Sequence, residues 1–476
     1  MKKLIIALFS SALIYSCSDE QYSDLNRDPN NPTTTRSEAL FTSAIKSLSD
    51  QMTSTNVNTN VYRLFAQYWT ETTYVDESNY DLVTRNIPAN HWSELYRDVL
   101  FDLKDAKKVV ESESQGTELE SKKAMITVLE VYTWQQMVDT FGDIPYSEAL
   151  MGSEKPSPKY DNAKEIYKDL FVRLDDAISK LGANGYASAD VIYQGDMSKW
   201  RKFANSLKLR LAMRVSDVAD MSALSKQKAQ EAVTAGVFGS NADNANIQYE
   251  AATPNTNPLW VDLVQSGRSD FVASNTIVNI MNTLSDPRRS EYFDQNLGAG
   301  LYVGGPYGDN NSFSSYTHVG PKMHDPTFRG VLLDYSEVQF MLAQAAAMSY
   351  TVSGTAESYY NNGITASMQE WGVSASNIST YLSNPSVSYS TASGDWRQKI
   401  GKQFWLAMYN RGFEGWTVWR QFNSPTFNLP VVSGLPVPSR YTYPISEQNL
   451  NGTNYAAAAT AIGGDLMTTK LFWDTL

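Results

Sequence analysis

Cysteine is almost absent from this sequence, since Cys17 is the only one among 476 residues. A lone cysteine excludes an internal disulfide and a thiolate metal cluster, so the fold must gain its stability from a large hydrophobic core. Cys17 is therefore a small buried side chain, a nucleophile, a ligand or a point of attachment. The residues that precede it favour attachment.

These residues resemble the signal of a bacterial lipoprotein. Lys2 and Lys3 form a short basic start, and residues 4–15 form an apolar run that is too short to cross a bilayer. Ser16 supplies a small residue directly before Cys17. The resemblance implies that residues 1–16 are a signal peptide and that Cys17 is lipidated. The alternative is a soluble secreted protein that is cut elsewhere.

Long apolar runs are absent from the rest of the sequence, so we expect membrane attachment only through the lipid on Cys17. Residues 17–35 are polar and contain proline, which predicts a flexible tether after the lipidated cysteine. No further linker divides the chain. We therefore expect residues 36–476 to form one large domain.

Positive charge is also limited, because 39 lysines and arginines stand against 51 aspartates and glutamates, a net charge of −12. The phosphates of nucleic acid require a basic surface, so no nucleic-acid partner is expected. Tight binding to anionic lipid is disfavoured for the same reason. Charge of this size serves solubility and indicates no particular substrate.

Histidine is scarce, and the sequence contains no recognisable catalytic motif. His318 and His324 lie six residues apart in a glycine-rich loop and match no zinc motif. There is no phosphate-binding loop, nucleophile elbow or dinucleotide fingerprint. We therefore assign no catalytic residue. A glycosidase needs only two carboxylates, so a helical polysaccharide-degrading enzyme stays open as an alternative.

One segment is suited to calcium. The sequence GDNNS at residues 308–312 offers hard oxygen ligands. Its spacing matches no defined calcium-binding loop, so calcium is a possibility without a motif and no cofactor is expected.

Apolar residues recur at helical spacing along most of the chain. Residues 121–141 place Ala124, Val128 and Val131 on one face, and Gly142 ends this predicted helix. Residues 334–350 and 355–373 predict a helical hairpin, because the alanines of the first segment permit close approach of the second. The sequence thus predicts a mostly α-helical fold.

A second helix pair is predicted at residues 399–422, with a break at Arg411 and Gly412. Aromatic residues recur through it at helical spacing and are interpreted as core. They are Trp405, Tyr409, Phe413, Trp416 and Trp419.

The predicted helix at residues 196–217 is basic on its outer faces. Its basic residues are Lys199, Arg201, Lys202, Lys208, Arg210 and Arg214. A phosphate-binding face is one interpretation. In an acidic exported protein we expect instead a solvated face whose charges pair with neighbouring carboxylates.

Two regions depart from the helical pattern. Residues 298–330 are rich in glycine, and aromatic residues among asparagine and aspartate predict a long functional loop there. Residues 430–476 carry four prolines and are also expected to be irregular.

Several stretches together resemble one family, the SusD/RagB-like outer-membrane nutrient-binding lipoproteins of Bacteroidetes. They occur in this order: RDPNNPTTT, FGDIPYSEAL, WRKFANSLKLRLAMR, SDPRRSEYF, YSEVQFMLAQAA, QFWLAMYNRGFEGWTVWR and YTYPISEQNLNGTNY. The resemblance implies a single large domain of tetratricopeptide-like helix pairs with long irregular loops. These stretches belong to the scaffold and contain no binding motif.

The resemblance also implies a function and a location. Members of this family are non-catalytic, bind oligosaccharide or polysaccharide, and deliver it to a TonB-dependent, SusC-like outer-membrane transporter. Ser18, Asp19 and Glu20 resemble the signal that sends such lipoproteins to the cell surface. We therefore expect a lipid-anchored, surface-exposed protein of the outer membrane. Peptide binding, as in some relatives, is the alternative within the family.

Candidate ligand-binding residues come from loop aromatics that are flanked by hydrogen-bonding groups, because sugars bind by stacking and by a few fixed polar contacts. An alternative for Tyr74 and Tyr80 is that they close a helical hairpin. The candidates are Tyr74, Asn79, Tyr80, Trp260, Arg268, Asp270, Tyr307, Asn310 and Tyr316.

Overall fold

The structure is a computed structural model that describes residues 35–182 and 184–476. The predicted signal peptide at residues 1–16, Cys17 and all but the last residue of the predicted tether lie outside these residues. No helix in the described parts of the chain is long and apolar enough to span a membrane.

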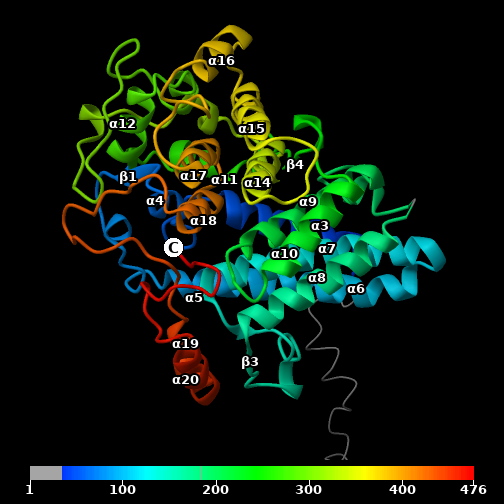
Figure 1. Cartoon of the computed structure of the whole chain (residues 1–476). Coiled ribbons are helices and arrows are strands. Elements are labelled where there is room, and N and C mark those ends of the chain that lie inside the picture. Colours follow the sequence, from blue (N-terminus) through cyan, green and yellow to red (C-terminus); the bar gives the residue numbers. More distant parts are fainter. Residues whose placement is uncertain (1–34, 183) are drawn as a thin grey trace, which may run out of the picture.

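The fold is mostly α-helical and forms one domain, as the sequence predicts. Consecutive helices pack as hairpins on one side of the molecule, where α7 lies against α8 and α9 lies against α10 (Figure 1). This helical half consists of α3 (Ser37–Thr53), η2 (Glu94–Leu100), α6 (Phe101–Glu113), α7 (Gly116–Phe141), α8 (Ala163–Lys180), α9 (Met197–Arg214) and α10 (Ser222–Ala235).

Two further hairpins form the centre. The predicted hairpin is confirmed as α14 against α15, and the predicted second pair as α17 against α18. Glycine is required at Gly412, the first residue of α18, because a side chain there would meet the backbone of Arg63. The central helices are α14 (Tyr335–Ala347), α15 (Ala356–Glu370), α16 (Ala375–Leu382), α17 (Trp396–Ala407) and α18 (Gly412–Phe422).

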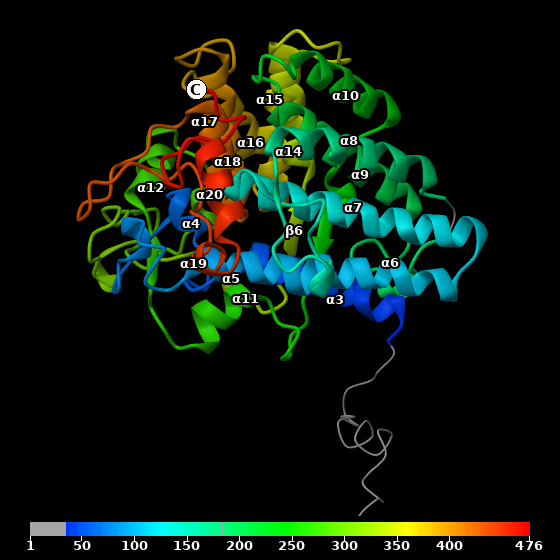
Figure 2. The ribbon, with the colours of Figure 1, turned by 90° about the horizontal axis from the view of Figure 1, so that it is seen from below.

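The opposite side is rich in loops (Figures 1 and 2). The long loop at residues 298–330 is confirmed, since it contains only short helical turns before its last residue enters a strand. The short helices here are α4 (Tyr62–Phe65), η1 (Glu77–Asn79), α5 (Ile87–Ser93), α11 (Pro258–Trp260), η6 (Val261–Gln265), α12 (Asn275–Thr283), α13 (Arg289–Tyr292), η7 (Phe313–Ser315) and η8 (Pro321–His324).

Three antiparallel strand pairs connect distant segments. β1 (Trp69–Glu71) pairs with β5 (Phe271–Ala273), β2 (Ile144–Pro145) with β3 (Tyr160–Asp161), and β4 (Ala245–Ile247) with β6 (Gly330–Leu333). In the first pair Thr70 lies opposite Val272, and this register positions the loops that follow both strands. Isolated turns occur at η3 (Gly152–Glu154), η4 (Ala187–Ala189) and η5 (Asn241–Asp243).

The C-terminal region is more regular than predicted. Residues 430–476 contain two helices, α19 (Ile445–Leu450) and α20 (Gly452–Ala461), although the whole region was expected to be irregular. The prolines lie before these helices, and Pro444 is at the start of α19, where a missing N–H costs no helical hydrogen bond. The alanines of α20 favour a helix intrinsically.

The aromatic stripe of the α17–α18 hairpin is largely core. Trp405, Tyr409, Phe413 and Trp416 are buried, as predicted, whereas Trp419 is only half-buried. The Trp405 indole N–H donates to the carbonyl oxygen of Ala66 at 3.0 Å, so the stripe also fixes the start of the loop-rich side.

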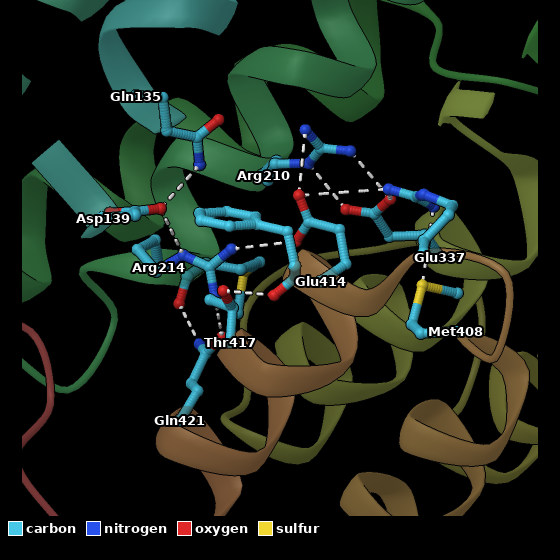
Figure 3. Close-up of polar contacts among 12 residues, drawn as sticks. Gln135, Asp139, Arg210, Arg214, Glu337, Met408, Glu414, Thr417 and Gln421 are labelled. Atoms are coloured by element: carbon cyan, nitrogen blue, oxygen red, sulfur yellow. Dashed lines mark hydrogen bonds and ion pairs between the residues drawn. The ribbon is translucent and has the colours of Figure 1, made fainter. Parts of the chain in front are cut away.

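The basic helix α9 corrects one expectation. Its charges pair with carboxylates, as predicted, but Lys208, Arg210 and Arg214 are buried instead of solvated. The Arg210 guanidinium donates to both Glu337 carboxylate oxygens, with Nε–Oε1 at 2.6 Å and Nη2–Oε2 at 2.8 Å (Figure 3). Arg214 pairs with Asp139 and Glu414. This buried ion network joins α7, α9, α14 and α18.

Candidate ligand-binding site

A cavity of about 730 Å³ opens where the β1–β5 strand pair ends. Its walls are residues 72–74, 268–270 and 310–313, and we call it the β1–β5 pocket. The Thr72 N–H donates to the Asp270 carbonyl at 2.9 Å, and the Thr72 hydroxyl donates to the Ser269 carbonyl at 2.6 Å. The strand pairing thus continues into the pocket and fixes two of its three walls. The volume is in the range of sites for small ligands.

Tyr74 supplies an open aromatic surface. Its side chain is 68% exposed, and its backbone is in the left-handed region at φ 55°. That conformation is costly for a bulky residue and persists where neighbouring structure enforces it, often at ligand-binding sites. The exposed ring is therefore available to stack on a ligand.

A second ring, Phe313, lines the same pocket. It is half-buried and stacks on the imidazole of His318, with ring centroids 3.7 Å apart. The His318 Nε2 lies 2.9 Å from the Phe313 carbonyl oxygen. These contacts hold the Phe313 ring in place, so the pocket has a second fixed aromatic side chain in its lining.

The polar part of the pocket includes one charged pair. Arg268 forms an ion pair with Asp270, and both side chains line the cavity. Asp270 is the one acid among the described residues of this lining. The remaining polar groups are hydroxyls and amides, so the pocket suits a neutral ligand with many hydrogen-bonding groups.

Asn311 holds the third wall against the first two. Its buried amide donates to the carbonyl oxygens of Glu71 at 2.9 Å, Pro306 at 3.1 Å and Asp309 at 2.8 Å. The first bond reaches β1 and the other two remain within the loop. Asn311 therefore fixes the position of residues 310–313.

Two buried carboxyl groups lie behind the pocket. Burial, together with the neighbouring Glu77, raises the pKa of Glu71, and its carboxyl accepts a hydrogen bond from the Ser78 N–H at 2.8 Å. Arg85 forms an ion pair with Glu77. These contacts close the loop that carries Tyr74.

Burial corrects the expectation for Tyr80 and Tyr307. Each side chain is 1% exposed, so neither ring presents a face to a ligand. The Tyr307 hydroxyl donates to the Leu64 carbonyl at 2.8 Å, and the two rings pack together at 6.1 Å between centroids. They support the loops from inside.

Asn79 also has a supporting position. Its Nδ2 donates to the carbonyl oxygens of Val75 at 2.8 Å and Gly308 at 3.0 Å, and its Oδ1 accepts from the Ser433 N–H at 2.9 Å. Three loops distant in sequence therefore meet at this side chain, and its hydrogen-bonding groups are used within the protein.

Trp260 and Tyr316 do not line the β1–β5 pocket. Trp260 is half-buried at the end of α11, and Tyr316 is half-buried two residues before His318. The structure thus brings together four of the nine candidates: Tyr74, Arg268, Asp270 and Asn310. The lining residues missed from sequence are Thr72, Thr73, Ser269, Asn311, Ser312 and Phe313. Phe313 carried a sequence signal as an aromatic residue in the predicted functional loop. Asn311 and Ser312 belong to the GDNNS segment, and Ser269 lies between two of the candidates, whereas Thr72 and Thr73 carried no signal.

No group of three or more histidine, cysteine, aspartate or glutamate side chains is positioned to hold a metal ion in residues 35–182 and 184–476. In the GDNNS segment, the Asp309 carbonyl accepts from Asn311 and the Gly308 N–H donates to the Thr70 hydroxyl at 3.1 Å. That the protein has no cofactor stays a prediction, with calcium at this segment as its alternative.

A scaffold of helical hairpins that presents a polar, loop-built pocket with an open aromatic ring is typical of a protein that binds a ligand. The family comparison agrees with this class. The chain belongs to the SusD-like family, whose model is described as "Starch-binding associating with outer membrane" and matches residues 29–444.

Solved structures of SusD homologues are similar over almost the whole chain. A protein titled as chitin-binding has a TM-score of 0.79 and 26% identity, with 93% of this chain and 100% of that chain covered. A chitin-binding SusD homologue from Flavobacterium johnsoniae has a TM-score of 0.77 and 26% identity, with coverage of 92% and 98%. A SusD homologue from Bacteroides uniformis has a TM-score of 0.79 and 26% identity, with coverage of 92% and 99%. None of the curated proteins matches this chain.

Proposed function

We propose that this protein binds a linear oligosaccharide or polysaccharide in the β1–β5 pocket and delivers it to a TonB-dependent, SusC-like transporter. The observation that carries the proposal is the Tyr74 ring, which is 68% exposed at a pocket that is also lined by the Phe313 ring, amides, hydroxyls and one ion pair. Sugar rings stack on such a surface, and their hydroxyls find partners in the surrounding polar groups.

The first ligand to test is chitin, because two of the similar structures carry chitin-binding in their titles. The acetamido group of its sugar is neutral and both donates and accepts hydrogen bonds, as the exposed amide of Asn310 in the pocket lining also does. Starch is the second ligand, from the description of the family.

The experiment uses residues 18–476 and a panel of polysaccharides and peptides in affinity electrophoresis and calorimetry. We expect retarded migration on one glycan and a loss of at least about fivefold in affinity on Tyr74→Ala, since stacking of one aromatic ring is worth about 1 kcal/mol or more. Tyr316→Ala is the matched control, because it removes a candidate tyrosine that does not line the pocket.

Other outcomes would refute the proposal in distinct ways. Binding of peptides alone would make the protein a peptide-binding relative. Release of soluble sugars by the purified protein would make it an enzyme.

We further propose that the protein is anchored at the cell surface through lipid on Cys17, with residues 17–35 as a tether. The support is the sequence before Cys17 and the description of the family. Metabolic labelling with a fatty acid tests it, and we expect label in the wild-type protein and none in Cys17→Ser. Delivery is tested by co-purification from detergent-solubilised outer membranes, where a TonB-dependent barrel is the expected partner.

A further inference from the structure

A second cavity of about 260 Å³ adjoins the β1–β5 pocket. We call it the adjoining pocket. It is lined by the connection between α3 and α4, including Asn56 and Asn58, and by Asp262 of η6. Arg268 and Asp270 line both cavities, so the two pockets meet at this ion pair.

The dividing ion pair is weak. The Arg268 side chain is 55% exposed, and pairs between exposed charges contribute about 0–1 kcal/mol. Arg268 and Asp270 therefore present hydrogen-bonding groups to a molecule that lies across them and do not form a rigid barrier. A linear ligand seated in the larger pocket has a path into the smaller one.

Asp262 is the unusual group of the adjoining pocket. It is half-buried and forms no ion pair within 4 Å with any described lysine or arginine. Its hydrogen-bond partners are local: the Ser54 hydroxyl lies 3.4 Å from Oδ2, and the Thr55 backbone N–H also donates to the carboxyl group. A carboxylate accepts several hydrogen bonds, so Asp262 retains accepting capacity toward the cavity.

The nearby cations are already engaged. Arg85 lines the pocket but pairs with Glu77. Arg63 donates to the carbonyl oxygens of Thr53 at 2.8 Å and Ser54 at 2.9 Å. No described lysine or arginine therefore pairs with Asp262, and its carboxyl group has room to accept a further hydrogen bond from a ligand.

Two asparagines supply further groups. The Asn56 Oδ1 accepts from the N–H of Asn58 at 3.0 Å and from its Nδ2 at 2.8 Å. These bonds leave the Nδ2 of Asn56 and the Oδ1 of Asn58 for other partners, and both residues are exposed. The pocket thus offers a carboxylate acceptor, an amide donor and an amide acceptor within one cavity.

We infer that the adjoining pocket is a second subsite of the same ligand site, and that the ligand is a chain of neutral or amino sugars that crosses the Arg268–Asp270 pair and donates hydrogen bonds to Asp262. The inference rests on the proposed function and adds a chain-length requirement and a charge preference to it. Uronic-acid chains are disfavoured, because their carboxylates would face the unpaired charge of Asp262.

The test is calorimetry with N-acetylglucosamine oligosaccharides from the disaccharide to the hexasaccharide, or with the same length series of another glycan if the panel identifies one. In the wild-type protein we expect the long chain to bind at least about tenfold more tightly than the disaccharide. One hydrogen bond to a charged group contributes enough binding free energy for this difference. Asp262→Asn should remove most of this gain and leave disaccharide affinity unchanged. Tyr74→Ala should weaken both ligands.

Each outcome separates the two proposals. Equal affinity for short and long chains, or a length dependence that Asp262→Asn leaves intact, refutes the second subsite while the β1–β5 pocket stands. Equal weakening of both ligands by Asp262→Asn indicates a structural effect and also refutes it. Asn56→Ala is the second variant if Asp262→Asn fails to fold. Absence of binding by any glycan at any length refutes the proposed function itself.

Discussion

The side-chain amide of Asn311 donates a hydrogen bond to the main-chain carbonyl of Glu71 at 2.9 Å, across 240 residues of sequence. This bond joins the loop at residues 310–313 to the last residue of β1. The aromatic and polar walls of the pocket are therefore held at a fixed separation by a residue that is itself buried.

Replacement of Asn311 by aspartate should destabilise the protein and weaken glycan binding. The substitution removes the donors and places a carboxylate against three carbonyl oxygens, which we expect to cost about 1–3 kcal/mol of unfolding free energy. Chemical denaturation measures the loss of stability, and calorimetry measures the loss of glycan binding.

Asn310→Ala is the control, because Asn310 lines the pocket but is exposed. Its loss should weaken binding and leave the unfolding free energy within about 0.5 kcal/mol of the wild-type value. Unchanged stability of Asn311→Asp would contradict the role of Asn311 in holding residues 310–313 against β1.

Removal of the Glu337 charge should lower the unfolding free energy more than Asn311→Asp does. Burial alone raises the pKa of Glu337, but the adjacent Arg210 and Arg411 guanidinium groups lower it to about 2. Glu337→Gln leaves two buried arginines without their shared counter-charge, and we expect a loss of about 3–5 kcal/mol in a denaturant titration. Glu111→Gln, which breaks an exposed pair with Lys123, should change stability by less than about 1 kcal/mol. Similar losses in both variants would show that burial of the network is unimportant.

His91 should make the protein sensitive to acid. Burial lowers the pKa of His91 to about 3, while its ring contacts Gln51 at 2.6 Å and the Tyr62 hydroxyl at 3.1 Å. Between about pH 6.5 and pH 3 the unfolded chain binds a proton that the folded chain does not, so stability falls as the pH decreases in this window. The slope is about 1.4 kcal/mol per pH unit for one proton.

Thermal unfolding of wild type and His91→Gln at several pH values measures this contribution. The variant is expected to lose less stability than the wild type between pH 6.5 and pH 4, whatever its stability at neutral pH. Parallel curves for the two proteins would exclude His91 as a source of the acid sensitivity.

Asp262 should make the protein less stable as the pH rises, which is opposite to the effect of His91. Burial raises its pKa to about 6, against the opposing effects of the hydrogen bonds from the Thr55 N–H and the Ser54 hydroxyl and of the nearby Arg63. The folded protein therefore retains a proton that the unfolded chain loses above about pH 4, and the stability gained from Asp262 is lost as the pH rises toward 6. The melting temperature of Asp262→Asn relative to wild type should increase from pH 4 to pH 7. A constant difference across this range would show that Asp262 is not desolvated.

The sequence predicted the helical scaffold well, because periodic apolar residues report directly on which face of a helix is buried. It could not show that Lys208, Arg210 and Arg214 are buried, since their partners come from other helices and burial of a charge depends on those partners. The same limit applies to α20, whose alanines lie beyond a proline-rich stretch that dominated the local pattern.

The site was predicted only in part, and for a related reason. Tyr74 and Tyr80 are six residues apart and have similar neighbours in the sequence, yet the Tyr74 ring is exposed and the Tyr80 ring is buried. Tyr80 is covered because Tyr307, from a segment far along the chain, packs against it. Loop side chains are sorted by contacts between distant segments, and a single sequence gives no direct signal of those contacts.

The separation of the helical half from the loop-rich side has a practical consequence for attaching the protein to a surface. Helix α3 begins among the hairpins, on the side away from β1 and α12 in Figure 1 and away from α12 in Figure 2. A biosensor surface, bead or fluorophore coupled just ahead of Ser37 would therefore leave the loop-rich side open to solution. Immobilised in this orientation, the domain can be exposed to intact, insoluble glycan particles as well as to soluble fragments.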